Sequence, residues 1–95
     1  MGVAEQFNES KKPVINFLEL EDDISITEVR ITSAFDNKTI GEINFRVKYN
    51  LNVIAITEEE KTTIEINANT ILKEGNELVV VGKNDDIAKF TKLNV

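Results

Sequence analysis

A stretch of helical periodicity passes into an apolar strand without an intervening loop, and this arrangement limits the possible folds of the chain. From Thr39 to Tyr49, apolar residues recur at the three- to four-residue spacing of a helix. The segment 51–56 follows at once and is almost wholly apolar, which is typical of a buried strand. A chain of 95 residues forms one small domain with a thin core.

The helical stretch presents more apolar surface than so small a core can bury. Thr39 is the expected N-cap, and Glu42 three residues later completes a capping box. The apolar residues of the stretch are Ile40, Ile43, Phe45, Val47 and Tyr49. Because they cover more than one face of a short helical segment, we expect one face to meet another subunit. The sequence thus predicts a subunit interface within residues 39–50.

The rest of the chain consists of strands joined by turns, with a helix at the end. The predicted strands are 14–20, 24–31, 51–56, 62–66 and 77–81, and the helix covers 84–93. Apolar residues change parity near Thr27 in the second strand, which predicts a β-bulge or a change of partner there. This order of elements predicts an α+β fold. We expect small mixed β-sheets, two short helices at a dimer interface and a C-terminal helix.

Single residues indicate where these elements end. Asn84 is the expected cap of the last helix, with Ile87, Phe90 and Leu93 facing inward. Gly75 is expected at a tight turn. Gly82 is expected to stop the last strand.

Residues 1–13 are expected to be the end of a preceding helix and a linker, with residues 14–95 as the domain. Apolar residues over 3–7 suit the last turns of a helix, and the polar residues that lead to Pro13 suit a linker. An independent short N-terminus is the alternative.

Composition weighs against several functions. The net charge of -6 argues against a broad surface for nucleic acid or anionic lipid. Without cysteine or histidine, the chain lacks thiol chemistry, the commonest general base and the commonest transition-metal ligand. We therefore expect a cytoplasmic protein that is not an enzyme and has no cofactor. No apolar run approaches the roughly 18–20 residues of a membrane span.

Two acidic runs, 19–23 and 58–60, are candidate sites for calcium or another hard cation. Neither run has the spacing of an EF-hand loop. Runs of this kind are normally solvated turns, so no metal site is expected.

Two segments of the chain follow the motifs of a known family. The segment 40–56, IGEINFRVKYNLNVIAI, follows a pattern of leucine-x-x-leucine-x-hydrophobic-arginine, then tyrosine-glycine, then a V-x-A-I strand. The segment 71–82, ILKEGNELVVVG, follows L-x-x-G-D-x-L-x-V-x-G. In order and spacing they resemble the RCK C-terminal (TrkA-C) domain family, over residues 14–93.

This resemblance implies a cytoplasmic regulatory lobe of a potassium channel, a Ktr or Trk uptake system, or a cation/proton antiporter. In the full-length protein such a lobe is peripheral to the inner face of the cell membrane, with a membrane potassium transporter subunit as its partner. The family also pairs with a second copy through the short helices, which implies a homodimer through residues 39–50.

The resemblance implies a ligand site as well, because KtrA-like gating subunits in this family bind cyclic di-AMP between two lobes. Arg46 matches the arginine that contacts phosphate, and Asn52 matches an asparagine near the adenine or phosphate. The matched apolar lining and the neighbouring contact positions are Ile40, Phe45, Val53, Asn44 and Ala68.

Several positions depart from the family pattern. Asn50 replaces a glycine, and asparagine tolerates the left-handed conformation needed there. Asn76 replaces the acidic residue of the Gly–Asp pair. Thr57 stands where a basic residue often follows the strand, and the pair 67–68 lacks a proline that helps cover an adenine in ligand-binding relatives. The last two changes weaken the implied cyclic di-AMP site and leave the fold unaffected.

Each ligand role has a structural alternative. Arg46 could form a salt bridge to Glu42, one helical turn away. Ile40, Phe45 and Tyr49 could pack as ordinary core or dimer interface. The whole domain could be a structural dimerisation module with a different ligand or none, which is the second hypothesis beside a ligand-binding regulatory domain.

Overall fold

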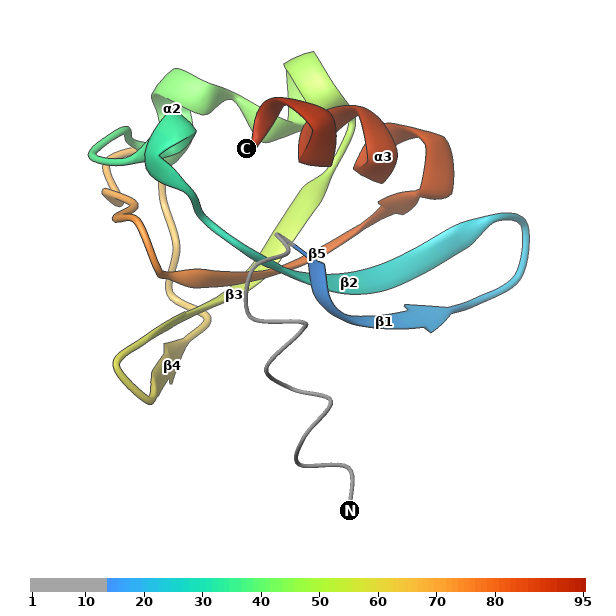
Figure 1. The fold of residues 1–95 in the computed structure, drawn as a ribbon, viewed down its shortest axis with the longest axis horizontal. Helices are drawn as coiled ribbons and strands as arrows, with labels where there is room; N and C mark the ends of the chain where they lie inside the picture. The colour runs from blue at the N-terminus through green and yellow to red at the C-terminus, as the bar shows by residue number, and fades with distance from the viewer. Residues whose placement is uncertain (1–13) are drawn as a thin grey trace.

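The computed structural model describes residues 14–95, so the predictions for residues 1–13 lie outside the described part. The strands are β1 (Val14–Glu19), β2 (Ile24–Arg30), β3 (Asn52–Glu58), β4 (Lys61–Thr63) and β5 (Glu77–Lys83). They form one sheet in the order β1-β2-β5-β3-β4 (Figure 1). The helical elements are η1 (Ser33–Phe35), α2 (Ile40–Ile43), η2 (Phe45–Tyr49) and α3 (Asn84–Leu93). The predicted α+β class is confirmed.

The strand pairs of the described chain are all antiparallel, which corrects the expectation of small mixed sheets. The central strand β5 lies between β2 and β3 and runs opposite to both. β2 and β3 run in the same direction, but β5 separates them, so they do not form a parallel pair. Short hairpins join β1 to β2 and β3 to β4, whereas a parallel pair needs a longer crossover.

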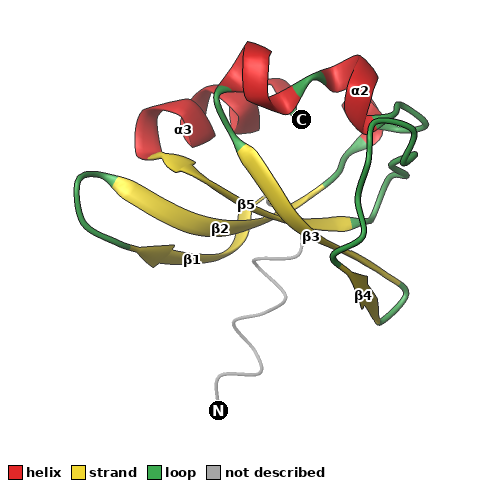
Figure 2. Cartoon of the chain, turned by 180° about the vertical axis from the view of Figure 1, so that it is seen from behind, coloured by secondary structure: helices red, strands yellow, loops and turns green. Residues whose placement is uncertain are grey.

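The helices lie together on one face of the sheet, and the core lies between them and the strands (Figures 1 and 2). Phe90 of α3 is fully buried there. Its ring centroid lies 5.1 Å from that of Phe35 and 5.2 Å from that of Phe45. Burying a large apolar side chain contributes about 1.5–3 kcal/mol. These ring contacts therefore help to hold α3 and the short helices on the sheet.

The sequence predicts a β-bulge or a change of partner near Thr27 in β2, but the structure has its irregularity in the neighbouring strand β1. β2 pairs with β5 over its whole length without a shift, while the register shift lies in β1, between Val14 and Asn16. Thr27 and Ser25 are buried on the core face of β2. The hydroxyl of Ser25 donates to Oδ1 of Asn84 at 2.7 Å. The apolar parity changes because these two inward positions are polar.

The passage from β5 to α3 also differs from the prediction. β5 continues directly into α3, so Lys83 is the N-cap and Asn84 is the first helical residue. The N–H of Asn84 instead donates to the carbonyl oxygen of Asp23 at 2.8 Å, which ties the helix to the β1–β2 hairpin. Gly82 lies inside β5 rather than at its end. A Cβ atom there would lie 2.5 Å from Cδ2 of Leu51, so a larger residue would force the Leu51 side chain to move.

A buried asparagine fixes the end of α3. Phe90 faces the core as predicted, whereas Leu93 is 54% exposed. The side chain of Asn94 is fully buried. Its Oδ1 accepts the N–H of Thr32 at 2.9 Å, and its Nδ2 donates to the carbonyl oxygen of Arg30 at 2.8 Å. These bonds hold the last turn of α3 against the end of β2.

Candidate ligand-binding site

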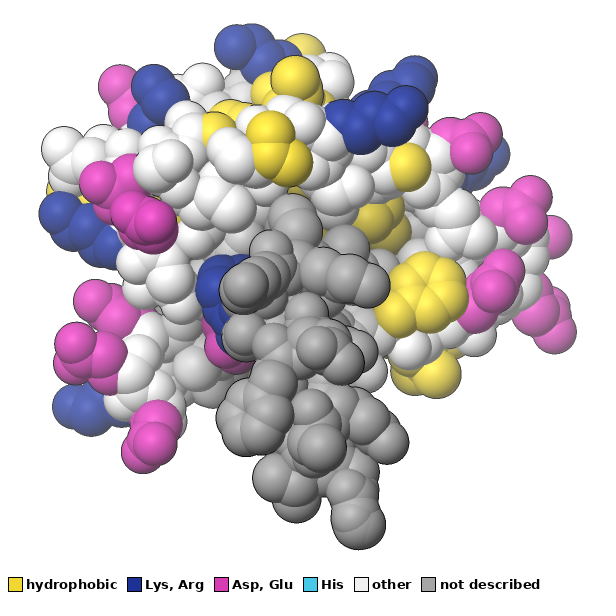
Figure 3. Space-filling model, in the orientation of Figure 1, with side chains coloured by type: hydrophobic (Ala, Val, Ile, Leu, Met, Phe, Trp, Pro, Cys, Tyr) yellow, Lys and Arg dark blue, Asp and Glu magenta, His cyan; other side chains and the backbone are white. Residues whose placement is uncertain are grey.

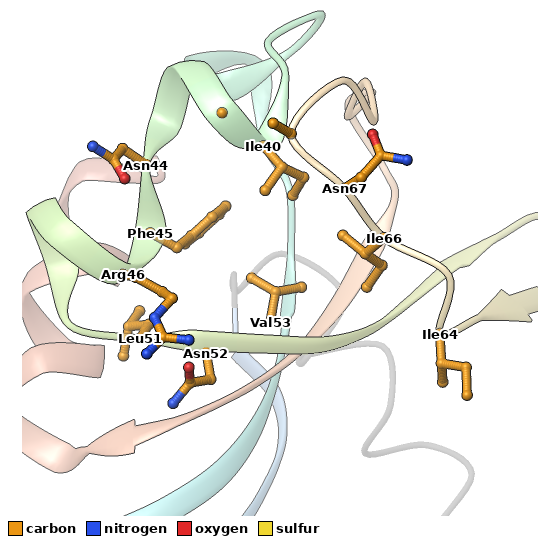
Figure 4. A pocket seen from close by; sticks show the side chains of 12 residues that line it. Ile40, Asn44, Phe45, Arg46, Leu51, Asn52, Val53, Ile64, Ile66 and Asn67 are labelled. Carbon is orange, nitrogen blue, oxygen red and sulfur yellow. The ribbon is translucent and has the colours of Figure 1, made fainter.

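A pocket of about 390 Å³ lies between the short helices, the start of β3 and the segment that follows β4 (Figure 4). Its lining residues are Ile40, Gly41, Asn44, Phe45, Arg46, Leu51, Asn52, Val53, Ile64, Ile66, Asn67 and Ala68. They include all seven positions that the family resemblance put forward. The fold thus brings these positions together around one opening.

The short helices are held by local interactions that the sequence predicted in part. Oγ1 of Thr39 accepts the N–H of Glu42 at 3.0 Å, and Oε1 of Glu42 accepts the N–H of Thr39 at 2.9 Å. This is the predicted capping box. The C-cap of α2 is Asn44, with φ of 59°, and the C-cap of η2 is Asn50, with φ of 56°. Asparagine tolerates this left-handed conformation, and the two turns set the direction of the side chains on η2 between them.

The interior of the pocket is apolar. Ile40, Phe45, Val53 and Ile66 point toward its centre (Figure 4). Phe45 is 3% exposed and belongs to both the pocket and the core, while the other three are partly buried against the core. An apolar interior with a few polar groups at its edge is typical of a small-molecule site.

Arg46 and Asn52 form the polar side of the opening. Arg46 extends from η2 toward the start of β3, where Asn52 is the first residue (Figure 4). Within residues 14–95, Arg46 has no ion-pair or hydrogen-bond partner. The alternative salt bridge to Glu42 is therefore not formed, because the Glu42 carboxylate caps α2. A guanidinium that is exposed beside an apolar floor can bind an anionic group through charge-assisted hydrogen bonds.

The segment that follows β4 forms the outer wall of the pocket, with Ile64, Ile66, Asn67 and Ala68 as its lining residues. Backbone hydrogen bonds join this wall to α2. The N–H of Gly41 donates to the carbonyl oxygen of Ala68 at 2.9 Å, and the N–H of Ile40 donates to the carbonyl oxygen of Thr70 at 2.8 Å. Ala68 therefore lies close against the helix. Asn44 lines the pocket from the other side, and its amide points away from the centre (Figure 4).

Sequence reasoning missed five of the lining residues, namely Gly41, Leu51, Ile64, Ile66 and Asn67. A strand is predicted over 62–66, but β4 ends at Thr63. The two isoleucines lie beyond it, on an irregular segment for which alternation gives no direction. Two β-branched apolar residues beside a polar loop were the signal that could have located this wall.

Two structural findings bear on other classes of function. Within residues 14–95, no helix has the length and apolar character needed to cross a lipid bilayer. The same part of the chain holds no group of three or more acidic side chains arranged around a metal position. The acidic runs at 19–23 and 58–60 lie at the turns of the two hairpins.

The fold and the pocket together define a class of small α+β domain, with one antiparallel sheet, helices on one face and an open pocket beside them. The chain belongs to the TrkA-C domain family, whose family model matches residues 26–94. The family predicted from segments 40–56 and 71–82 is confirmed.

The comparisons also find individual relatives. The Ktr system potassium uptake protein A of Bacillus subtilis (strain 168) is 32% identical over 90 residues, which are 95% of this chain and 40% of that protein. The chain thus spans less than half the length of this curated relative. The structure of the KtrA RCK C domain in complex with cyclic diadenosine monophosphate is 27% identical and has a TM-score of 0.71, covering 94% of this chain and 95% of that chain. The RCK_C domain dimer of S. agalactiae BusR in complex with c-di-AMP has a TM-score of 0.66 at 23% identity, over 72% and 92% of the two chains, and shows the fold alone.

Proposed function

We propose that this chain is a cytoplasmic regulatory domain of a Ktr- or Trk-type potassium uptake system, and that two copies bind cyclic di-AMP between them to control ion transport. The observation that carries the proposal is the guanidinium of Arg46, unpaired within residues 14–95, at the mouth of an apolar pocket. In the full-length protein the partner is the membrane subunit of the transporter. The similarity to the KtrA domain structure supports this ligand.

Cyclic di-AMP combines the two kinds of group that the pocket can hold. Its adenines are flat rings that fit the apolar floor of Ile40, Phe45 and Val53. Its phosphates are anions, and the planar guanidinium of Arg46 can donate two parallel hydrogen bonds to a phosphate. A charge-assisted bond of this kind contributes about 1.5–3 kcal/mol.

A dimer supplies the symmetry that the ligand needs. The pocket of one chain, at about 390 Å³, is near the lower end of the roughly 300–1,000 Å³ of small-molecule sites. A twofold axis beside residues 39–50 places two such pockets, and two arginines, around one ligand with two equal halves. Val47 is 78% exposed on η2 and supplies apolar surface for this interface.

The alternative is a structural dimerisation module of an RCK protein or a cation/proton antiporter, with a different ligand or none. The observation that favours this alternative is the absence of a proline from the outer wall of the pocket. Asn67 and Ala68 stand there in place of the proline that the family resemblance associates with covering an adenine, and both are exposed.

Thermal denaturation with and without cyclic di-AMP, together with the molar mass in solution, separates these functions. For the regulatory domain we expect a dimer whose melting temperature rises with ligand, through binding to the native state. The rise is lost in Arg46→Ala and partly kept in Arg46→Lys, since lysine keeps the charge without the two-pronged geometry. A dimer with no rise favours the structural module, and a monomer contradicts both.

A further inference from the structure

A second cavity, of about 460 Å³, lies beside the β3–β4 hairpin and shares no lining residue with the ligand pocket. Its lining residues are Ile56, Glu58, Glu59, Lys61, Thr62, Thr63, Thr70, Ile71 and Asn76. They come from the hairpin and from the connection that leads to β5. The hairpin projects from the body of the sheet in both ribbon views (Figures 1 and 2). Most of the lining residues are exposed, so the cavity opens to solvent.

A nearly buried amide in this cavity has a free donor. Asn76 is 6% exposed. Its Oδ1 accepts the N–H of Lys73 at 2.8 Å, while its Nδ2 makes no hydrogen bond with any residue of the described chain. Since no buried side-chain nitrogen or oxygen of the described residues lacks a partner, this unbonded nitrogen reaches solvent. An acceptor oxygen from outside, such as a carbonyl, can satisfy this donor.

The backbone of β4 offers further unpaired groups. β4 is the last strand of the described sheet, and its three residues are exposed. Glu58 faces Lys61 across the two-residue turn, and such a pair exchanges backbone hydrogen bonds. The N–H and C=O of the next residue, Thr62, therefore point away from β3. Neither Thr62 nor Ile64 forms another backbone bond within the part of the chain that the structure describes.

The charge beside this edge is negative. Glu58, Glu59 and Glu60 stand next to a single lysine, Lys61, and all four side chains are exposed. Acidic side chains gather over this projecting hairpin in the space-filling view (Figure 3). Ile71, which is 53% exposed, gives the cavity an apolar side as well.

We propose that β4 and this cavity dock an extended, basic segment of a partner protein, which adds a strand to the sheet. Its backbone pairs with Thr62 and Ile64, and one of its carbonyl oxygens accepts from Nδ2 of Asn76. Its alternating lysine or arginine and apolar side chains meet the glutamates and Ile71. Strand addition of this kind takes its affinity from backbone bonds and its specificity from the pockets beside them. Ile64 also lines the ligand pocket, but docking of the basic segment does not require cyclic di-AMP.

The test is an NMR titration with a nine-residue peptide in which lysine alternates with valine. We expect saturable shifts at the backbone amides of Thr62, Ile64 and Ile71 and at the side-chain amide of Asn76. A peptide with glutamate in place of lysine binds at least tenfold more weakly. The same loss is expected for the lysine peptide when its inward backbone nitrogens are N-methylated, because these can no longer donate to β4.

Protein variants separate the backbone and charge contributions. Thr62→Pro removes the outward N–H and leaves the backbone bonds to β3 in place, while it also removes the hydroxyl bond to Thr57. We expect at least tenfold weaker binding. The double change Glu58→Gln and Glu59→Gln lowers affinity severalfold at low salt, whereas Asp22→Asn with Asp23→Asn, at the other hairpin, leaves it unchanged. Absence of saturable shifts, or equal binding of the N-methylated peptide, overturns the proposal even where Thr62→Pro does not fold.

Discussion

The N–H of Gly41 donates to the carbonyl oxygen of Ala68 at 2.9 Å and so joins α2 to the outer wall of the ligand pocket. A Cβ atom on Gly41 would lie 3.0 Å from both Cβ and O of Ala68. The wall can approach the helix this closely because residue 41 has no side chain. The width of the pocket is therefore set at this contact.

Gly41→Ala is expected to displace the outer wall by a few tenths of an ångström. The gain in helix propensity, about 0.5–1 kcal/mol, offsets part of the steric cost, so the melting temperature changes little. Affinity for cyclic di-AMP falls by about tenfold, which corresponds to roughly 1.4 kcal/mol. Calorimetry and thermal denaturation measure the two effects.

Gly75→Ala is the matched control. Gly75 has φ of +95° and nothing within 4 Å of a Cβ position, so alanine there costs stability through backbone strain alone. We expect a loss of about 1 kcal/mol in the free energy of unfolding, with ligand affinity unchanged. If Gly41→Ala and Gly75→Ala behave alike in both measurements, the contact with Ala68 does not set the pocket.

The turn of the β3–β4 hairpin stores strain. Glu59 and Glu60 have φ of 49° and 70°, in the left-handed region that glycine and asparagine favour. Replacing the pair by Asn–Gly should raise the free energy of unfolding by about 1–2 kcal/mol. For a domain of this size, each kcal/mol corresponds to about 4–8 °C in melting temperature. Unchanged or lower melting temperature would show that the turn is not strained.

Asn94 is expected to be the most sensitive polar residue at the end of α3. Asn94→Ala leaves the N–H of Thr32 and the carbonyl oxygen of Arg30 without their present partner. Each buried group left unpaired costs about 1–3 kcal/mol. Denaturant unfolding should show a loss in this range, with a smaller one for Leu93→Ala, whose side chain is 54% exposed. Equal losses contradict this role for Asn94.

Gly82 and Leu51 should be coupled, because a Cβ atom on Gly82 would lie 2.5 Å from Cδ2 of Leu51. Gly82→Ala alone is expected to cost about 1–3 kcal/mol through overpacking. In a Leu51→Ala background it should cost less by at least about 0.5 kcal/mol, since the clashing atom is gone. A double-mutant cycle of unfolding free energies measures this, and strict additivity argues against the clash.

Features that depend on neighbouring residues could be predicted from the sequence. The capping box of Thr39 and Glu42 involves only one helical turn, so local rules were sufficient. The left-handed turn at Asn50 was expected from the glycine that the family pattern has there. The apolar strands and α3 were also predictable from their periodicity.

Features that depend on tertiary contacts could not be predicted. Ser25 and Thr27 face the core because Asn84, far along the chain, supplies a hydrogen-bond partner. The outer wall of the pocket was missed for the same reason. Backbone bonds from α2 place it, and the spacing of Ile64 and Ile66 contains no information about those bonds.

We propose that two arginines, one from each copy, hold one cyclic di-AMP in the pocket between them. Isothermal titration calorimetry of the purified chain with cyclic di-AMP tests it directly. We predict one ligand per two chains, with the heat lost or the affinity reduced by about tenfold or more in Arg46→Ala. No binding heat, one ligand per chain, or full affinity in Arg46→Ala would contradict the claim.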